Sequence, residues 1–254
     1  MANLTNFAFA ISLLVGALAG LVKGVTGFAM PLIMISALSS FLTPDLALAG
    51  LILPTLVTNF SQAFRQGLWP ALETARFFWR FLTAVLVMIM ISAQFVRVIP
   101  QGLFFLLLGL PTSIYALVLL LGKSLALPLR HRGRAEWALG VVAGFYGGLA
   151  GVWGPPLLVY LFSINADKKT VTRVQGVVFL LGAFALLGAH LYSGILNLVT
   201  VPFSAALCVP ALAGMALGFR LQDCLSELTF NRLVQAMLMV AGLNLMRRAL
   251  EGFF

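Results

Sequence analysis

Lys23 is the residue of this sequence with the clearest chemical potential, because it is a cation within an otherwise apolar run. It belongs to the stretch "GALAGLVKGVTGFAMP", Gly16 to Pro31, which also supplies Gly24, Thr26 and Gly27. An ammonium group at membrane depth is costly unless it is paired or hydrated. We therefore predict that these four residues help to bind an anion. The alternative is that Lys23 extends along the helix to a nearby membrane surface.

A second stretch repeats this pattern 124 residues later. When "GVVAGFYGGLAGVWGP" is placed on the first stretch, four glycines and a proline coincide: Gly16, Gly20, Gly24, Gly27 and Pro31 match Gly140, Gly144, Gly148, Gly151 and Pro155. Such self-similarity at one constant offset indicates a duplicated unit. In membrane transporters, interrupted hydrophobic segments at corresponding places in two repeats indicate the binding site.

The prolines of both stretches predict helix breaks, at Pro31 in the first copy and at Pro155 and Pro156 in the second. A new helix start exposes backbone N–H groups that favour an anion. Irregular backbone at membrane depth is tolerated only inside a protein or around a water-filled cavity. We predict that the breaks at 23–31 and 147–156 face each other near the membrane midplane and form an anion site. The second copy would contribute Gly148, Gly151, Trp153 and Gly154. Close helix packing by the glycines alone is the alternative.

Two further groups of polar residues lie within apolar runs. Asn59 and Gln62 are three residues apart and share one face of a helix. They either contact the substrate or hydrogen-bond between helices, and the spacing does not separate these roles. Arg173 and Gln175 begin the segment that follows the second break, where we predict a gate or a further anion contact.

The whole chain has the composition of a membrane protein, with 61% hydrophobic and 9% charged residues. We predict an all-α integral membrane bundle, because lipid requires internally satisfied backbone groups and no strand alternation is present. The polar interval "GKSLALPLRHRGR" at 122–134 separates two sets of five apolar runs. The predicted organisation is a first membrane repeat at 1–122, a basic cytoplasmic loop at 123–134 and a second membrane repeat at 135–254.

Each predicted repeat contains a Gly/Pro-broken segment followed by three spans, which gives about 8 transmembrane segments. With the N-terminus outside, the loop lysines and arginines all face the cytoplasm except Arg97, Arg247 and Arg248. This distribution favours inverted repeats. It also explains the net charge of +9 by membrane orientation, with no need for nucleic acid as a partner.

The sequence predicts neither an enzyme nor a cofactor. It lacks GxSxG, HExxH and an intramembrane carboxylate pair. The cysteines Cys208 and Cys224 form no CxxC or Cys/His cluster, so we interpret them as apolar fillers. A phosphate-binding GxxxxGK[ST] motif is also missing, so transport would be driven by an ion gradient or by the substrate's own gradient.

The paired glycine–proline motifs, together with "INADKKTVTRVQG" after the second one, resemble the TauE/SafE family of bacterial sulfite exporters. The resemblance implies export of a small anion, such as sulfite or an organosulfonate, across the bacterial cytoplasmic membrane. The first copy has Lys23 where the second has Gly147, so its charge is unique to one half. We predict a secondary transporter that works by alternating access. The alternative is an anion channel lined by the same glycines. The expected partners are the anion and the lipid bilayer, with a homo-oligomer as a further option.

Overall fold

A computed structural model of the chain describes residues 5–92 except 39, scattered residues between 103 and 121, residues 132–150, and residues 153–251 except 193. Within these residues every regular element is an α-helix, as predicted, and no strand occurs. The helices are α1 (Asn6–Thr26), α2 (Met30–Leu38), α3 (Pro44–Ala63), α4 (Leu68–Phe77), α5 (Trp79–Ser92), α7 (Arg132–Ala150), α8 (Gly154–Ser163), α9 (Lys168–Tyr192), α10 (Val201–Cys224) and α11 (Glu227–Glu251).

Five of these helices, α1, α3, α9, α10 and α11, are long and apolar enough to cross a membrane. A sixth span results if α4 and α5, which bend by 77° at their junction, count as one. The chain is therefore a multi-pass helical membrane protein. The predicted total of about 8 spans includes the apolar run at 102–121, which lies largely outside the described residues. The same holds for the basic loop up to residue 131, whereas Arg132 and Arg134 belong to the first turn of α7.

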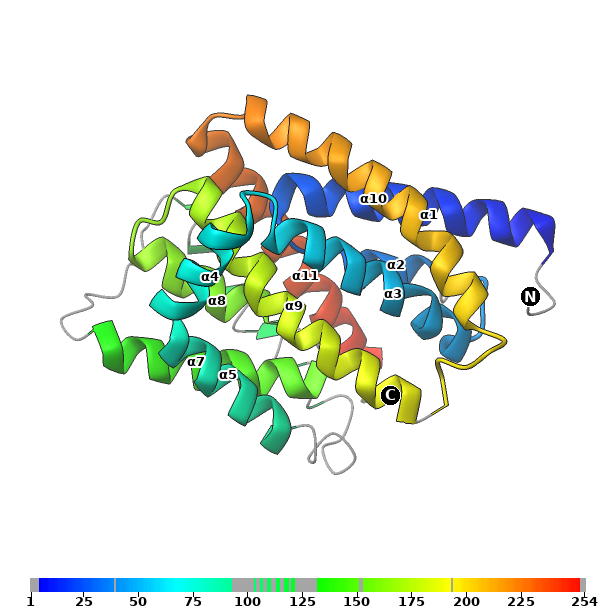
Figure 1. Cartoon of the computed structure of the whole chain (residues 1–254), viewed down its shortest axis with the longest axis horizontal. Coiled ribbons are helices and arrows are strands. Elements are labelled where there is room, and N and C mark those ends of the chain that lie inside the picture. Colours follow the sequence, from blue (N-terminus) through cyan, green and yellow to red (C-terminus); the bar gives the residue numbers. More distant parts are fainter. Residues whose placement is uncertain are drawn as a thin grey trace. The chain divides into compact units, whose positions relative to one another are not determined.

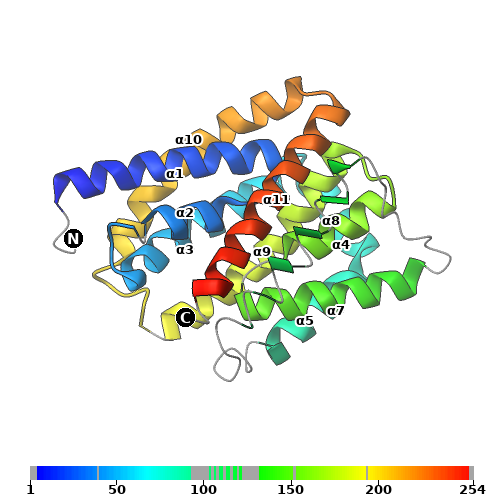
Figure 2. The same ribbon diagram turned by 180° about the vertical axis from the view of Figure 1, so that it is seen from behind.

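The chain divides into two compact units that do not coincide with the predicted sequence halves. Unit 1 consists of Met1–Ala71 and Thr172–Ser226, and unit 2 consists of Leu72–Val171 and Glu227–Phe254. Each unit therefore combines helices from both halves of the sequence. In unit 1, α1 runs beside α10, and in unit 2, α5 runs beside α7 (Figure 1). The same pairs are adjacent from behind (Figure 2).

Small residues allow α1 and α10 to touch backbone to backbone. A Cβ added to Gly20 would lie 2.1 Å from the Ala211 carbonyl oxygen, and one added to Gly24 would lie 2.3 Å from that of Met215. In the opposite direction, a Cβ at Gly214 of α10 would lie 2.0 Å from a carbonyl oxygen of α1. No side chain fits at these positions, so the glycine spacing serves close helix packing.

Unit 2 contains an equivalent contact between α7 and α5. A Cβ at Gly144 would lie 2.5 Å from the Val85 carbonyl oxygen. The corresponding contact in unit 1 is the one between Gly20 and the Ala211 carbonyl oxygen, at 2.1 Å. Gly144 follows Gly20 by 124 residues, and Ala211 follows Val85 by 126. The glycine helix of each sequence half thus packs against a helix that comes from the other half.

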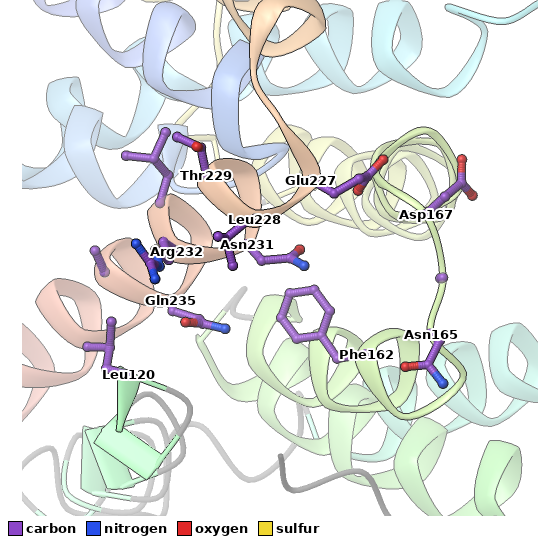
Figure 3. Close-up of a pocket in the computed structure, with 13 residues that line it drawn as sticks. Leu120, Phe162, Asn165, Asp167, Glu227, Leu228, Thr229, Asn231, Arg232 and Gln235 are labelled. Carbon is purple, nitrogen blue, oxygen red and sulfur yellow. The ribbon is translucent and has the colours of Figure 1, made fainter. Parts of the chain in front are cut away.

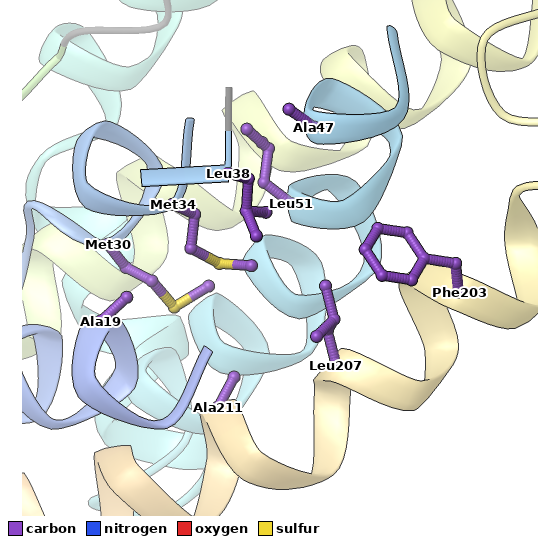
Figure 4. Packing of buried hydrophobic residues seen from close by; sticks show 9 residues of the cluster. All are labelled: Ala19, Met30, Met34, Leu38, Ala47, Leu51, Phe203, Leu207 and Ala211. Carbon is purple, nitrogen blue, oxygen red and sulfur yellow. The ribbon is translucent and has the colours of Figure 1, made fainter. Parts of the chain in front are cut away.

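The apolar core of unit 1 lies between α1, α2, α3 and α10. Figure 4 shows its buried side chains: Ala19, Met30, Met34, Leu38, Ala47, Leu51, Phe203, Leu207 and Ala211. Met30 marks the limit of this layer, because its sulfur lies 3.6 Å from the Thr58 hydroxyl oxygen. Beyond that point the interior of unit 1 becomes polar. The outer face of α1 is apolar and exposed at Phe7, Leu14 and Leu18, as expected for a helix that contacts lipid.

Candidate functional site

The first helix break begins at Gly27, which caps α1 in a left-handed conformation with φ 83°. Its N–H donates to the Lys23 carbonyl oxygen at 2.7 Å. The Thr26 hydroxyl donates to the Val22 carbonyl oxygen at 2.9 Å and so closes the last turn of α1. Pro31 lies in the first turn of α2, where the missing N–H costs no helical hydrogen bond. Thr26 and Pro31 therefore shape the break.

Lys23 lies in the last turn of α1 and points into unit 1. Its side chain is only 1% exposed, and its Nζ donates to Thr58 Oγ1 at 3.0 Å and to Asn59 Oδ1. Both acceptors belong to α3 and precede the end of that helix. A lysine that extended along its helix to the membrane surface would have an exposed ammonium group. The buried Nζ of Lys23 therefore does not fit that alternative. Among the described residues, no carboxylate forms an ion pair with Lys23.

One helical turn further along α1 and α3, Gly27 meets two buried glutamines. Gln62 Nε2 donates to the Gly27 carbonyl oxygen at 3.0 Å and to that of Thr172 at 2.9 Å. A Cβ at Gly27 would lie 1.9 Å from Gln175 Oε1, and the φ of 83° also disfavours any residue other than glycine here. Neither amide atom of Gln175 has a hydrogen-bond partner among the described protein atoms, and the same is true of Gln62 Oε1. Buried polar atoms without partners are costly, which makes these side chains candidates for ligand contact.

A third polar layer closes this end of unit 1. Arg65 donates to Gln222 Oε1 at 2.6 Å and to Asp223 Oδ2 at 2.7 Å, and its guanidinium stacks on the Phe219 ring at 3.9 Å. Gln222 Nε2 donates to the Val25 carbonyl oxygen at 3.1 Å and to the Thr172 hydroxyl at 2.9 Å. This layer connects α1, α9 and α10 to the segment that follows α3. Sequence reasoning did not identify Gln222, although its amide within the apolar α10 was an available signal.

We call Lys23, Thr58, Asn59, Gln62 and Gln175 the polar cluster; all five are at most 1% exposed. Its contacts show that α1 and α3 run in the same direction, because Lys23 pairs with Asn59 and the later Gly27 pairs with the later Gln62. Helix α9 runs in the opposite direction, because Asn59 donates to the Phe179 carbonyl oxygen and Gln62 to that of the earlier Thr172. The cluster residues of α1 and α3 lie within about 8 Å of the ends of these helices, measured along their axes. The first break thus lies at the ends of these helices, not at their middle.

The other predicted site residues lie elsewhere. Gly24 packs against α10, and Arg173 donates to Gln66 Oε1 at the start of α9. In unit 2, Gly148 lies within α7, Trp153 is buried just before α8, and Gly154, Pro155 and Pro156 form the first turn of α8. Gly151 is outside the described residues. The second break therefore also ends one helix and starts a short one, and its participation in the anion site stays a prediction.

Comparison with protein families gives one match, to the sulfite exporter TauE/SafE family over residues 12–245. The chain belongs to this family. Comparisons with curated proteins and with solved structures find no match. Membership in TauE/SafE implies a membrane transporter of sulfite or related anions, which agrees with the multi-pass helical fold.

This TauE/SafE chain also contains a cavity of about 1060 Å³ in unit 2, between the link from α8 to α9 and the first turns of α11 (Figure 3). Two carboxylates line it, and both cap the start of α9. Asp167 Oδ1 accepts from the Thr170 N–H at 3.3 Å, and Glu227 Oε2 accepts from the Lys168 N–H at 3.2 Å. Arg232 also lines the cavity, so an anion there would meet one cation and two carboxylates. The polar cluster of unit 1 is therefore the better candidate site.

Unit 2 of the TauE/SafE chain also contains a buried carboxylate that sequence reasoning missed. Glu136, 2% exposed, accepts a hydrogen bond from the Tyr160 hydroxyl at 2.7 Å, and Arg80 lies 3.9 Å from its other oxygen. The sequence gave little indication that Glu136 is buried, because this residue comes just after the predicted basic loop. Its partners come from α5 and α8, so it joins three helices of unit 2.

Proposed function

We propose that this TauE/SafE protein is a secondary transporter that exports a small anion, sulfite or an organosulfonate, across the bacterial cytoplasmic membrane. The proposed binding site is the polar cluster of unit 1. The observation that carries the proposal is a fully buried lysine with no carboxylate partner among the described residues, one turn from an amide with unused hydrogen-bonding atoms. A small oxyanion would supply both the negative charge and the acceptors that this arrangement needs.

The donors of the cluster suit an anion with several oxygen atoms. Lys23 can direct a further N–H toward it, and Gln175 Nε2 is a second donor that has no partner among the described residues. Hydrogen bonds to charged groups contribute about 1.5–3 kcal/mol each. Two such contacts would favour a sulfur oxyanion over a neutral molecule of similar size.

Alternating access explains why the cluster is closed. The cluster residues are buried, and the third polar layer around Arg65 and Gln222 covers the end of unit 1 next to them. Loading would require this layer to separate on the cytoplasmic side. We propose that the second break completes the site and that the two halves are inverted repeats of a broken segment followed by three spans. The helix bounds support a repeat, because α2 and α8 start at Met30 and Gly154, 124 residues apart.

A thermal-shift screen tests the binding part of the proposal. The purified protein would be heated with sulfite, sulfate, thiosulfate, sulfoacetate, taurine and small carboxylates in turn. A ligand at 100 times its Kd stabilises the folded protein by about 2.7 kcal/mol. We expect a sulfur oxyanion to raise the melting temperature most. A screen in which no anion raises it would contradict the proposed site.

Counterflow in proteoliposomes tests the transport part. A transporter with alternating access takes up labelled anion faster when unlabelled anion is present on the opposite side, and its flux saturates. A channel with the same glycines around a pore shows neither property. We expect trans-stimulated, saturable flux. Unsaturable flux without trans-stimulation would replace the transporter by a channel.

A further inference from the structure

We propose that Lys23 couples anion transport to protons: its amine takes up one proton when the anion binds and gives it up when the anion leaves. This inference rests on the proposed function, and it names the coupling ion for the same site. The first observation is the electrostatic isolation of Lys23 within unit 1. Its two hydrogen-bond partners, Thr58 and Asn59, are both neutral. A bare buried ammonium costs several kcal/mol, so the amine needs an anion to hold its charge.

The charged side chains of the surrounding helices do not provide that anion. Around Lys23, the described parts of α2, α3, α9 and α10 contribute no titratable side chain in contact with its Nζ. The charged groups nearest along these chain segments are engaged elsewhere. Arg65 pairs with Asp223, and Arg173 donates to Gln66. Arg220 of α10 is exposed on the surface of the helix.

The second observation is the match between hydrogen-bond donors and acceptors at Lys23. A neutral amine has two N–H groups, and the structure provides two acceptors, Thr58 Oγ1 and Asn59 Oδ1. Both are fixed as acceptors by their own donations. The Thr58 hydroxyl donates to the Pro54 carbonyl oxygen at 2.6 Å, and Asn59 Nδ2 donates to that of Phe179 at 3.0 Å. The third N–H of an ammonium has no acceptor among the described residues.

The protonation and binding steps then support each other. On the loading side, the amine accepts a proton from water through its nitrogen lone pair, and the anion forms an ion pair with the third N–H. With a monoanion such as methanesulfonate, the site thereby passes from a neutral amine to a neutral ion pair, which avoids an uncompensated buried charge in either state. On the other side, the anion leaves and the proton returns to water. One monoanion therefore travels with one proton in the same direction, and no net charge moves. Export in this form is driven by the anion's own gradient, and an acidic exterior opposes it.

Proton uptake on binding is the direct test. Calorimetric titration with sulfate, thiosulfate and methanesulfonate, which stay ionised near pH 8, would be carried out in two buffers of different ionisation enthalpy. The difference in heat gives the protons bound per anion. We expect about one proton for the wild-type protein. Lys23→Arg carries a permanent charge, so it should bind the anion with no proton uptake. Glu136→Gln removes the buried carboxylate of unit 2 and should leave the number of protons bound per anion unchanged.

The outcomes separate this inference from the proposed function. Anion binding without proton uptake would overturn proton coupling and leave the transporter intact. If none of the three anions binds and no anion of the thermal-shift screen raises the melting temperature, both proposals fail. Proton uptake that persists in Lys23→Arg, or is lost in Glu136→Gln, would assign coupling to another group. Should Lys23→Arg not fold, the proton count of the wild-type protein, compared with Glu136→Gln, decides the question. In proteoliposomes we expect Lys23→Arg to exchange anions across the membrane while losing proton-driven net flux.

Discussion

Two buried glutamines of unit 1 should respond in opposite ways to the same substitution. Gln175 is 0% exposed, and its amide atoms have no partner among the described residues. Gln222 is 2% exposed, but its amide forms hydrogen bonds with Arg65, Val25 and Thr172 at 2.6, 3.1 and 2.9 Å. Gln175→Leu removes buried polar atoms that lack partners, so the free energy of unfolding should rise by about 1–3 kcal/mol. Gln222→Leu loses three hydrogen bonds and should lower it by about 2–5 kcal/mol.

The measurement is the fraction of detergent-purified protein that stays folded after heating, with and without the anion found in the screen. Gln175→Leu should melt at a higher temperature than wild type yet lose the additional shift caused by the anion. The two variants share the same chemistry, helix context and burial, so each controls for the other. If Gln175→Leu melts as low as Gln222→Leu, the Gln175 amide has stabilising partners of its own, and its assignment to a ligand fails.

Two further substitutions test the packing of each unit. Gly20→Ala places a methyl group 2.1 Å from a carbonyl oxygen of α10, whereas Gly16→Ala places one at an ordinary 3.6 Å. Thermal unfolding should show that Gly20→Ala is less stable than Gly16→Ala by about 1–3 kcal/mol. Equal stability would show that α1 and α10 are not in backbone contact. Tyr160→Phe removes the hydroxyl that donates to the buried Glu136 carboxylate in unit 2, so it should lower the free energy of unfolding by about 1–3 kcal/mol. The same substitution should cost less in a Glu136→Gln background. An equal loss in both backgrounds would assign the effect to packing of the ring.

The features that were predictable from the sequence are local or repeated. The break after α1 was visible because Gly27 and Pro31 determine backbone conformation by themselves. The all-helical membrane fold followed from composition alone. Hydrogen bonding between helices was one of the two roles that the spacing of Asn59 and Gln62 offered, and the structure shows such bonds for both; the other role, contact with the substrate, stays a prediction.

The features that were not predictable depend on which helices meet. The sequence shows that α1 and α7 are similar, but it does not show that each packs against a helix from the other half. The sequence around Thr58 does not indicate that its hydroxyl accepts a hydrogen bond from Lys23. This role depends on the position of the Lys23 amine in the folded protein. Gln222 lies about 200 residues from Val25, its partner on α1. Contacts over such distances in the sequence arise from the exchange of helices between halves, which no local pattern records.

The two faces of α1 explain how one helix can be both rigid and responsive. Gly20 and Gly24 hold one face against the backbone of α10, where a separation would forfeit close packing along the helix. Lys23 and Gly27 contact α3 and α9, where several polar atoms have no hydrogen-bond partner among the described residues. Movement on this second face would break the hydrogen bonds of Lys23 and Gly27 but no close backbone packing, and an incoming anion would supply new hydrogen bonds. We therefore expect the proposed site to open on the side of α1 that carries the lysine, while α1 and α10 stay together.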